Sequence, residues 1–144
     1  AKALVLVLIL LPGIAGIVKF HPYEYTYYNF ATTSQQTIFR NFETDYWATS
    51  FKQVTTYIND NAPENSQVIV WGPGQLIKHY ARKDLQVKSF DDLKDKEYST
   101  HPYYLVLTTR YNKDQAFFPE IQPVYSVQNN NSILAVVKYI TPQK

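Results

Sequence analysis

A continuous apolar run from Leu4 to Val18 leads straight into an aromatic block, Phe20 to Phe30, with only Lys19 between them. Tyrosine favours the headgroup zone of a membrane because its ring is apolar and its hydroxyl is wet. An apolar helix followed by a cation and a cluster of tyrosines is therefore typical of a chain leaving a bilayer. We expect residues 1–20 to be the end of a transmembrane helix and residues 21–47 to be an aromatic, membrane-proximal segment.

Two other interpretations of the apolar run stay open. It covers roughly 16 residues, against about 20 for a complete span, so it could also be the core of a signal peptide or a buried helix. A signal peptide ends at a small-residue cleavage site, whereas this run ends in Val18-Lys19-Phe20. Pro12, Gly13 and Gly16 weaken a soluble helix but are tolerated in membrane helices. With no Met in the chain, we expect it to be part of a longer protein.

The composition excludes several classes of function. With 144 residues the chain can form one domain with a core, and a net charge of +2 without a basic stripe gives no indication of nucleic-acid binding. The absence of Cys removes disulfides, thiolate metal sites and Cys nucleophiles. The three histidines lie far apart in the sequence, so we predict neither a metal site nor a cofactor.

Short apolar segments alternate with helical patterns after residue 48. Continuous or alternating apolar patterns predict strands at 67–71, 85–90, 103–108, 124–127 and 133–139. Between them, helices are expected after a capping box at Ser50–Gln53, at 75–80 and at 112–118. Strands alternating with helices imply an α/β fold. We predict a small three-layer-like domain over 48–144, with a mostly parallel sheet and a C-terminal antiparallel hairpin.

The segment Phe42-Glu-Thr-Asp-Tyr-Trp47 is the clearest candidate for a binding site. In an extended chain Glu43 and Asp45 would share a face, and carboxylates beside aromatic rings suit a sugar, whose hydroxyls and ring face they can bind. Alternatively, the acids cap the following helix or pair with Arg40, and the rings fill the core. A second motif, Gly72-Pro-Gly74, lies where phosphate loops occur, but it lacks the Lys-Ser/Thr of a P-loop. A soluble nucleotide-binding protein is therefore a weaker alternative.

Three strings together resemble a known family: His21-Pro-Tyr-Glu-Tyr-Thr-Tyr-Tyr-Asn29, Phe42-Glu-Thr-Asp-Tyr-Trp-Ala-Thr-Ser-Phe-Lys52 and Asn59-Asp-Asn-Ala-Pro63. They are similar to the C-terminal end of bacterial multi-pass glycosyltransferases related to dolichyl-phosphate-mannose protein mannosyltransferases. By motif the resemblance covers most of residues 1–75. It implies a last membrane span followed by a small α/β domain on the extracytoplasmic side of the cell membrane.

The resemblance also implies what this domain does and does not do. The family transfers a sugar from a polyprenyl-phosphate donor, and its catalytic acids lie in loops near the N-terminus of the whole protein, so no catalytic residue is carried over. We expect an accessory domain that supports acceptor binding or the catalytic loops. Its expected partners are membrane lipid, the remaining transmembrane part of the parent chain, and a polyprenyl-phosphate sugar or glycan acceptor. The alternative is a stand-alone, membrane-tethered binding module. The predicted substrate-binding residues are Tyr25, Asn29, Glu43, Asp45, Tyr46 and Trp47.

Overall fold

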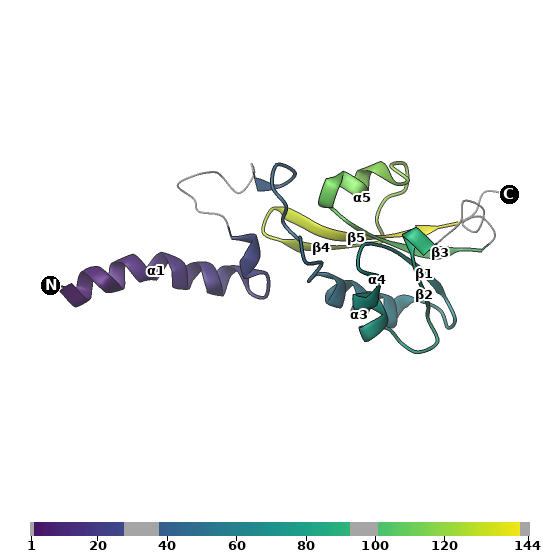
Figure 1. Cartoon of the computed structure of the whole chain (residues 1–144), viewed down its shortest axis with the longest axis horizontal. Coiled ribbons are helices and arrows are strands. Elements are labelled where there is room, and N and C mark those ends of the chain that lie inside the picture. Colours follow the sequence, from purple (N-terminus) through teal and green to yellow (C-terminus); the bar gives the residue numbers. More distant parts are fainter. Residues whose placement is uncertain (1, 28–37, 93–100, 142–144) are drawn as a thin grey trace.

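The computed structural model describes residues 2–27, 38–92 and 101–141. The apolar run forms α1 (Lys2–Phe20), which projects from the rest of the chain (Figure 1). From Leu4 to Leu11 its side chains are 50–68% exposed. Among the described residues, no helix is both long and apolar enough to cross a membrane. The predicted site residue Asn29 lies outside the described residues.

Five strands form one sheet in the order β2-β1-β3-β5-β4. They are β1 (Gln67–Trp71), β2 (Gln86–Ser89), β3 (Tyr103–Thr108), β4 (Tyr125–Asn129) and β5 (Ser132–Ile140). β1 pairs in parallel with both β2 and β3, whereas β5 is antiparallel to both β3 and β4. The α/β fold and the C-terminal hairpin are confirmed. The sheet is divided, with three parallel strands on one side and the hairpin on the other.

Helices cover one face of this sheet, and a short helix with its following loop covers the other (Figure 1). On the first face lie α3 (Phe51–Asn61) and α4 (Gly74–Tyr80). Phe51, Val54 and Ile58 fall on one side of α3 and are fully buried against the sheet, because their spacing matches the helical repeat. On the second face α5 (Lys113–Ala116) is followed by Phe117 and Phe118, which pack against β3 and β5. The chain therefore has three layers.

The turn at Gly72-Pro-Gly74 has a conformational explanation. Gly72 has a φ of 123°, a region that favours glycine, and a Cβ there would lie 3.5 Å from the Phe51 ring. The N–H of Gly74 donates to the carbonyl of Gly72 at 2.8 Å, which closes the turn between β1 and α4.

Hydrogen bonds join the end of α1 to the domain. The Asn129 side chain, at the tip of the β4–β5 hairpin, donates to the Phe20 carbonyl at 3.1 Å. The short helix η1 (Glu24–Thr26) follows α1, and the Tyr23 hydroxyl before it donates to Gln53 of α3 at 2.7 Å. The predicted capping box is therefore wrong: Gln53 binds Tyr23, and Ser50 makes no capping bond because its backbone is already helical.

Candidate functional site

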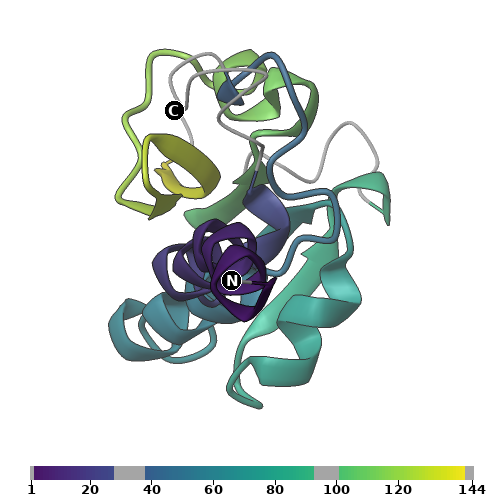
Figure 2. The same cartoon turned by 90° about the vertical axis from the view of Figure 1, so that its left-hand side faces the viewer.

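The carboxyl ends of β1 and β3 lie at the same edge of the sheet as the tip of the β4–β5 hairpin. After β1 the chain passes to β2 on one side, and β3 then lies on the other side of β1. In open α/β sheets ligands bind outside the carboxyl ends of strands at such a switch point. Because the hairpin tip also contacts Phe20, this edge of the sheet faces α1. Figure 2 views the molecule from the α1 side.

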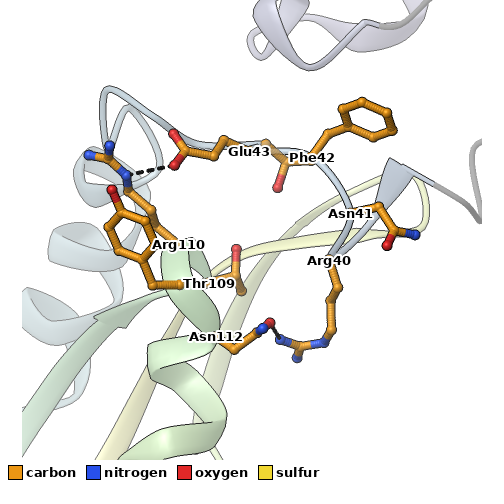
Figure 3. Close-up of a pocket in the computed structure, with 9 residues that line it drawn as sticks. Arg40, Asn41, Phe42, Glu43, Thr109, Arg110 and Asn112 are labelled. Atoms are coloured by element: carbon orange, nitrogen blue, oxygen red, sulfur yellow. Dashed lines mark hydrogen bonds and ion pairs between the residues drawn. The ribbon is translucent and has the colours of Figure 1, made fainter.

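A hollow of about 190 Å³ lies at this edge, between two loops. One loop contributes residues 40–44, and the other contributes residues 109–112, which directly follow β3 (Figure 3). Arg40, Tyr111 and Asn112 have φ angles of 71°, 53° and 53°. Asn adopts this left-handed region readily, but for other residues it costs about 1–2 kcal/mol. Such strain persists where the surroundings impose it and is often associated with function.

Hydrogen bonds hold Arg40 in this conformation. Its guanidinium donates to both carboxylate oxygens of Asp114, at 2.7 and 3.2 Å, and to the Asn112 side-chain oxygen at 2.8 Å. Asp114 is 8% exposed, so its charge is neutralised inside the protein by a two-pronged ion pair. These contacts tie the two loops together below the hollow, where Figure 3 shows Arg40 and Asn112 side by side.

A second arginine closes the opposite side of the hollow. Arg110 Nε donates to Glu43 Oε1 at 3.0 Å, and this hydrogen bond raises the pKa of the guanidinium. The guanidinium carbon of Arg110 lies 4.3 Å from the Tyr46 ring and 4.8 Å from the Tyr111 ring. The planar guanidinium therefore contacts two aromatic rings and a carboxylate, which together restrict its orientation.

Tyr46 and Trp47 project from the surface beside the hollow. They are 51% and 71% exposed, and their rings meet edge to face at 4.9 Å. The alternative in which these rings fill the core is wrong for both. An exposed Trp supported by a clamped Tyr offers a rigid ring face to a ligand at a small cost in conformational entropy.

Tyr25 and Asp45, both predicted site residues, bind one another. Asp45 is 4% exposed and accepts hydrogen bonds from the Tyr25 hydroxyl at 2.6 Å, the Thr49 amide at 2.9 Å and the Ser50 hydroxyl. Burial raises the pKa of Asp45, and the bonds from Ser50 and Tyr25 oppose this rise. Burial also raises the pKa of Tyr25, with Asp45 adding to the effect. This pair joins the segment after α1 to the residues that precede α3.

Glu43 and Asp45 do not share a face. Glu43 faces Arg110, whereas Asp45 points into the protein toward Tyr25. Arg40 pairs with Asp114 and not with either of these acids. Asp45 thus binds the two residues that precede α3, through the Thr49 amide and the Ser50 hydroxyl, and Glu43 lines the hollow.

The loop after β3 was missed by sequence reasoning. Arg110, Tyr111 and Asn112 are three of the nine residues that line the hollow, yet Arg110 contacts Glu43 across 67 residues and Asn112 contacts Arg40 across 72. A signal was nevertheless present: these residues follow a strongly apolar parallel strand, where binding loops of α/β domains occur.

The hollow offers hydrogen-bonding groups and aromatic rings. Within the described ranges no three His, Cys, Asp or Glu side chains come close enough to hold a metal ion. A carboxylate, a guanidinium, an amide and exposed rings can bind a neutral, hydroxyl-rich molecule by hydrogen bonding and stacking. Comparisons with family models, with characterised proteins and with solved structures give no match for this chain.

Proposed function

We propose that this chain is the extracytoplasmic accessory domain of a membrane glycosyltransferase that uses a polyprenyl-phosphate sugar donor. In this proposal α1 is the end of a span, embedded in lipid or packed against the parent's other spans, and the hollow supports acceptor binding. The observation that carries the proposal is the shared edge: the hollow and the contact of α1 both lie at the carboxyl end of the parallel strands.

The exposure of α1 supports its place in lipid. Eleven large apolar side chains between Leu4 and Val18 are at least 50% exposed. In water each such side chain would forgo about 1.5–3 kcal/mol of burial, and a contiguous apolar surface of this kind marks a membrane or protein contact. Two hydrogen bonds to tyrosines, Tyr23–Gln53 and Tyr25–Asp45, fix the domain to the end of this helix.

The chemistry of the hollow supports a glycan as ligand. Its Glu43 carboxylate and Asn112 amide can exchange hydrogen bonds with sugar hydroxyls, and Tyr111, which is 66% exposed, can cover an apolar sugar face. The ion pair between Glu43 and Arg110 leaves little net charge there, which suits a neutral sugar better than an anion.

A stand-alone, membrane-tethered binding module is the second candidate. It is favoured by the complete sheet and two-sided core that the domain forms with its own residues. The two candidates share the glycan site and differ in whether a catalytic segment belongs to the same protein. Sugar transfer from a polyprenyl-phosphate donor by the protein expressed from its complete gene distinguishes them.

The test measures binding of the whole chain, held in detergent micelles, to arrayed mono- and oligosaccharides. We expect Glu43→Gln to weaken binding by about tenfold, because a charged hydrogen-bond acceptor is lost. The matched control is Glu64→Gln, an exposed carboxylate remote from the hollow in sequence. A wild-type chain that binds no glycan, or a Glu43→Gln variant that binds as the wild type does, would contradict the proposed function.

A further inference from the structure

Trp47 lines a second hollow. It has a volume of about 240 Å³ and is lined by Trp47, Ala48, Thr49, Lys52, Leu76 and Tyr80. It lies between the start of α3 and α4, and its two aromatic walls, Trp47 and Tyr80, are 71% and 44% exposed. Most of the wall of this hollow is apolar or aromatic. Its charged residue is Lys52, whose ammonium lies 5.7 Å from the centre of the Tyr80 ring.

A chain of contacts connects this hollow to the first one. Glu43 binds Arg110, Arg110 lies on the Tyr46 ring, and the Tyr46 ring supports Trp47, with separations of 3.0, 4.3 and 4.9 Å. The groups that orient Arg110 in the first hollow therefore also orient the Trp47 ring in the second. The short segment from Glu43 to Trp47 lines the first hollow with its first residues and the second hollow with its last.

We propose that the two hollows are successive subsites for one extended glycan chain, in which Trp47 and Tyr80 take a sugar unit next to the unit held at Glu43 and Arg110. This inference rests on the proposed function and names its substrate class, an oligosaccharide of at least two units. A sugar chain presents both an apolar ring face and a rim of hydroxyls. The two hollows offer first a polar subsite and then an aromatic one.

Other ligands fit the two hollows less well. A peptide bound as an added strand needs free main-chain groups, but the amides of Ala48 and Thr49 already donate to Asp45. A lipid tail would have to lie over the ion pair of Glu43 and Arg110, at a cost in desolvation. A bilayer surface that takes up the Trp47 ring is the competing occupant, and the experiment separates it from a glycan.

The experiment follows Trp47 fluorescence in a chain carrying Trp71→Phe, so that Trp47 is the sole reporter. The probes are α-linked mannose, β-linked glucose and β-linked N-acetylglucosamine oligomers of one to four units, added to the chain in detergent micelles. Affinity should rise roughly tenfold from one unit to three, the gain expected from one added aromatic contact, with a blue shift of Trp47 emission.

Two variants test the second subsite directly. Tyr80→Ala, measured by Trp47 fluorescence, and Trp47→Ala, measured by calorimetry in the otherwise unaltered chain, should each reduce the gain with chain length to less than about twofold. Trp47 is largely exposed, so its truncation removes little buried surface. Tyr139→Ala, which truncates a tyrosine 39% exposed on β5, is the matched control and should keep the full gain.

The outcomes separate the inference from the proposed function. If no oligomer binds at any length, both are wrong. If Glu43→Gln weakens binding as expected but the gain with chain length persists in Trp47→Ala and Tyr80→Ala, the second subsite is wrong and the first stands. A Trp47 blue shift on adding sugar-free phosphatidylcholine vesicles, without a gain from longer oligomers, would assign the ring to the membrane surface and overturn the inference.

Discussion

α1 and β3 are both built from consecutive large apolar residues, yet their surroundings are opposite. From Leu4 to Leu11 the side chains of α1 are 50–68% exposed, whereas every residue of β3 from Tyr103 to Thr108 is at most 9% exposed. The comparison teaches that an apolar run does not by itself tell what covers its side chains. For β3 the cover is two layers of the same domain; for α1 we propose that it is lipid or another helix.

The length of each run decides its local structure. β3 has six residues, rich in ring and branched side chains, and a strand of this length gains its hydrogen bonds from β1 and β5. α1 has 19 residues and satisfies its own backbone, so it needs no neighbouring strand. A helix satisfies its own backbone hydrogen bonds and can therefore project from the domain. A strand needs hydrogen bonds to neighbouring strands and cannot.

The largest difference in stability is expected when one leucine is truncated in each of the two regions. Leu107→Ala in β3 should lower the free energy of unfolding of the domain by about 2–5 kcal/mol, because it opens a cavity in a fully packed layer. Leu8→Ala in α1, where the side chain is 58% exposed, should change it by less than about 0.5 kcal/mol. Denaturant titration in micelles, followed by the fluorescence of Trp71 beside Leu107, measures both.

Equal losses in the two leucine variants would break the comparison. They would mean that α1 is packed on the domain and contributes to the same unfolding transition, against its exposure from Leu4 to Val18.

A smaller effect is expected from replacing one lysine in each of the two regions. Lys138 of β5 is 2% exposed, and its ammonium donates to the carbonyls of Phe117 and Phe118 at 2.8 Å each. Lys138→Met keeps the apolar stem but leaves both carbonyls without this donor, so stability should fall by about 1–3 kcal/mol. Lys19→Met, which changes an exposed lysine of α1, is the control and should leave domain stability unchanged. Thermal unfolding measures both, and a Lys138→Met variant as stable as the wild type would show that the carbonyls find other donors.

The sequence was sufficient for the elements whose apolar pattern is local. The expected strands at 67–71 and 103–108 match β1 and β3 residue by residue, and the expected helix after Ser50 is α3. These segments are identified easily because the spacing of their apolar residues indicates which faces are buried. The order of the strands, with β5 between β3 and β4, depends on pairing over long separations and was not predictable.

The candidate site was predictable only in its first half. Glu43 and Tyr46 were singled out by local composition, whereas Arg110 and Tyr111 reach them through the fold. The expected common face of Glu43 and Asp45 failed because the rule of alternation holds only in strands, and this segment turns. Asp45 is buried and accepts hydrogen bonds from Tyr25 and Ser50. No local sequence pattern indicates this role.

The smallest effect concerns the joint between the two regions and its response to alkali. Tyr23 is 6% exposed, and burial raises its pKa from 10.0 to about 12, with Asp45 and Tyr125 adding to the rise. A raised pKa means that the folded chain holds the hydroxyl proton more tightly than the unfolded chain does. The stability that this proton contributes is therefore complete below pH 10 and is lost as the pH rises toward 12.

Tyr23→Phe should remove that part of the alkaline loss. At pH 7 the variant loses the hydrogen bond to Gln53 and should be less stable by about 0.5–1.5 kcal/mol, and this difference should shrink between pH 10 and 12. Tyr111→Phe, which removes the hydroxyl of a tyrosine 66% exposed, is the matched control. Denaturant titrations at pH 7, 10 and 11 measure the difference. If it stays constant across these pH values, the Tyr23 hydroxyl is open to solvent, and the end of α1 is held to the domain by Asn129 and by the Tyr25–Asp45 pair alone.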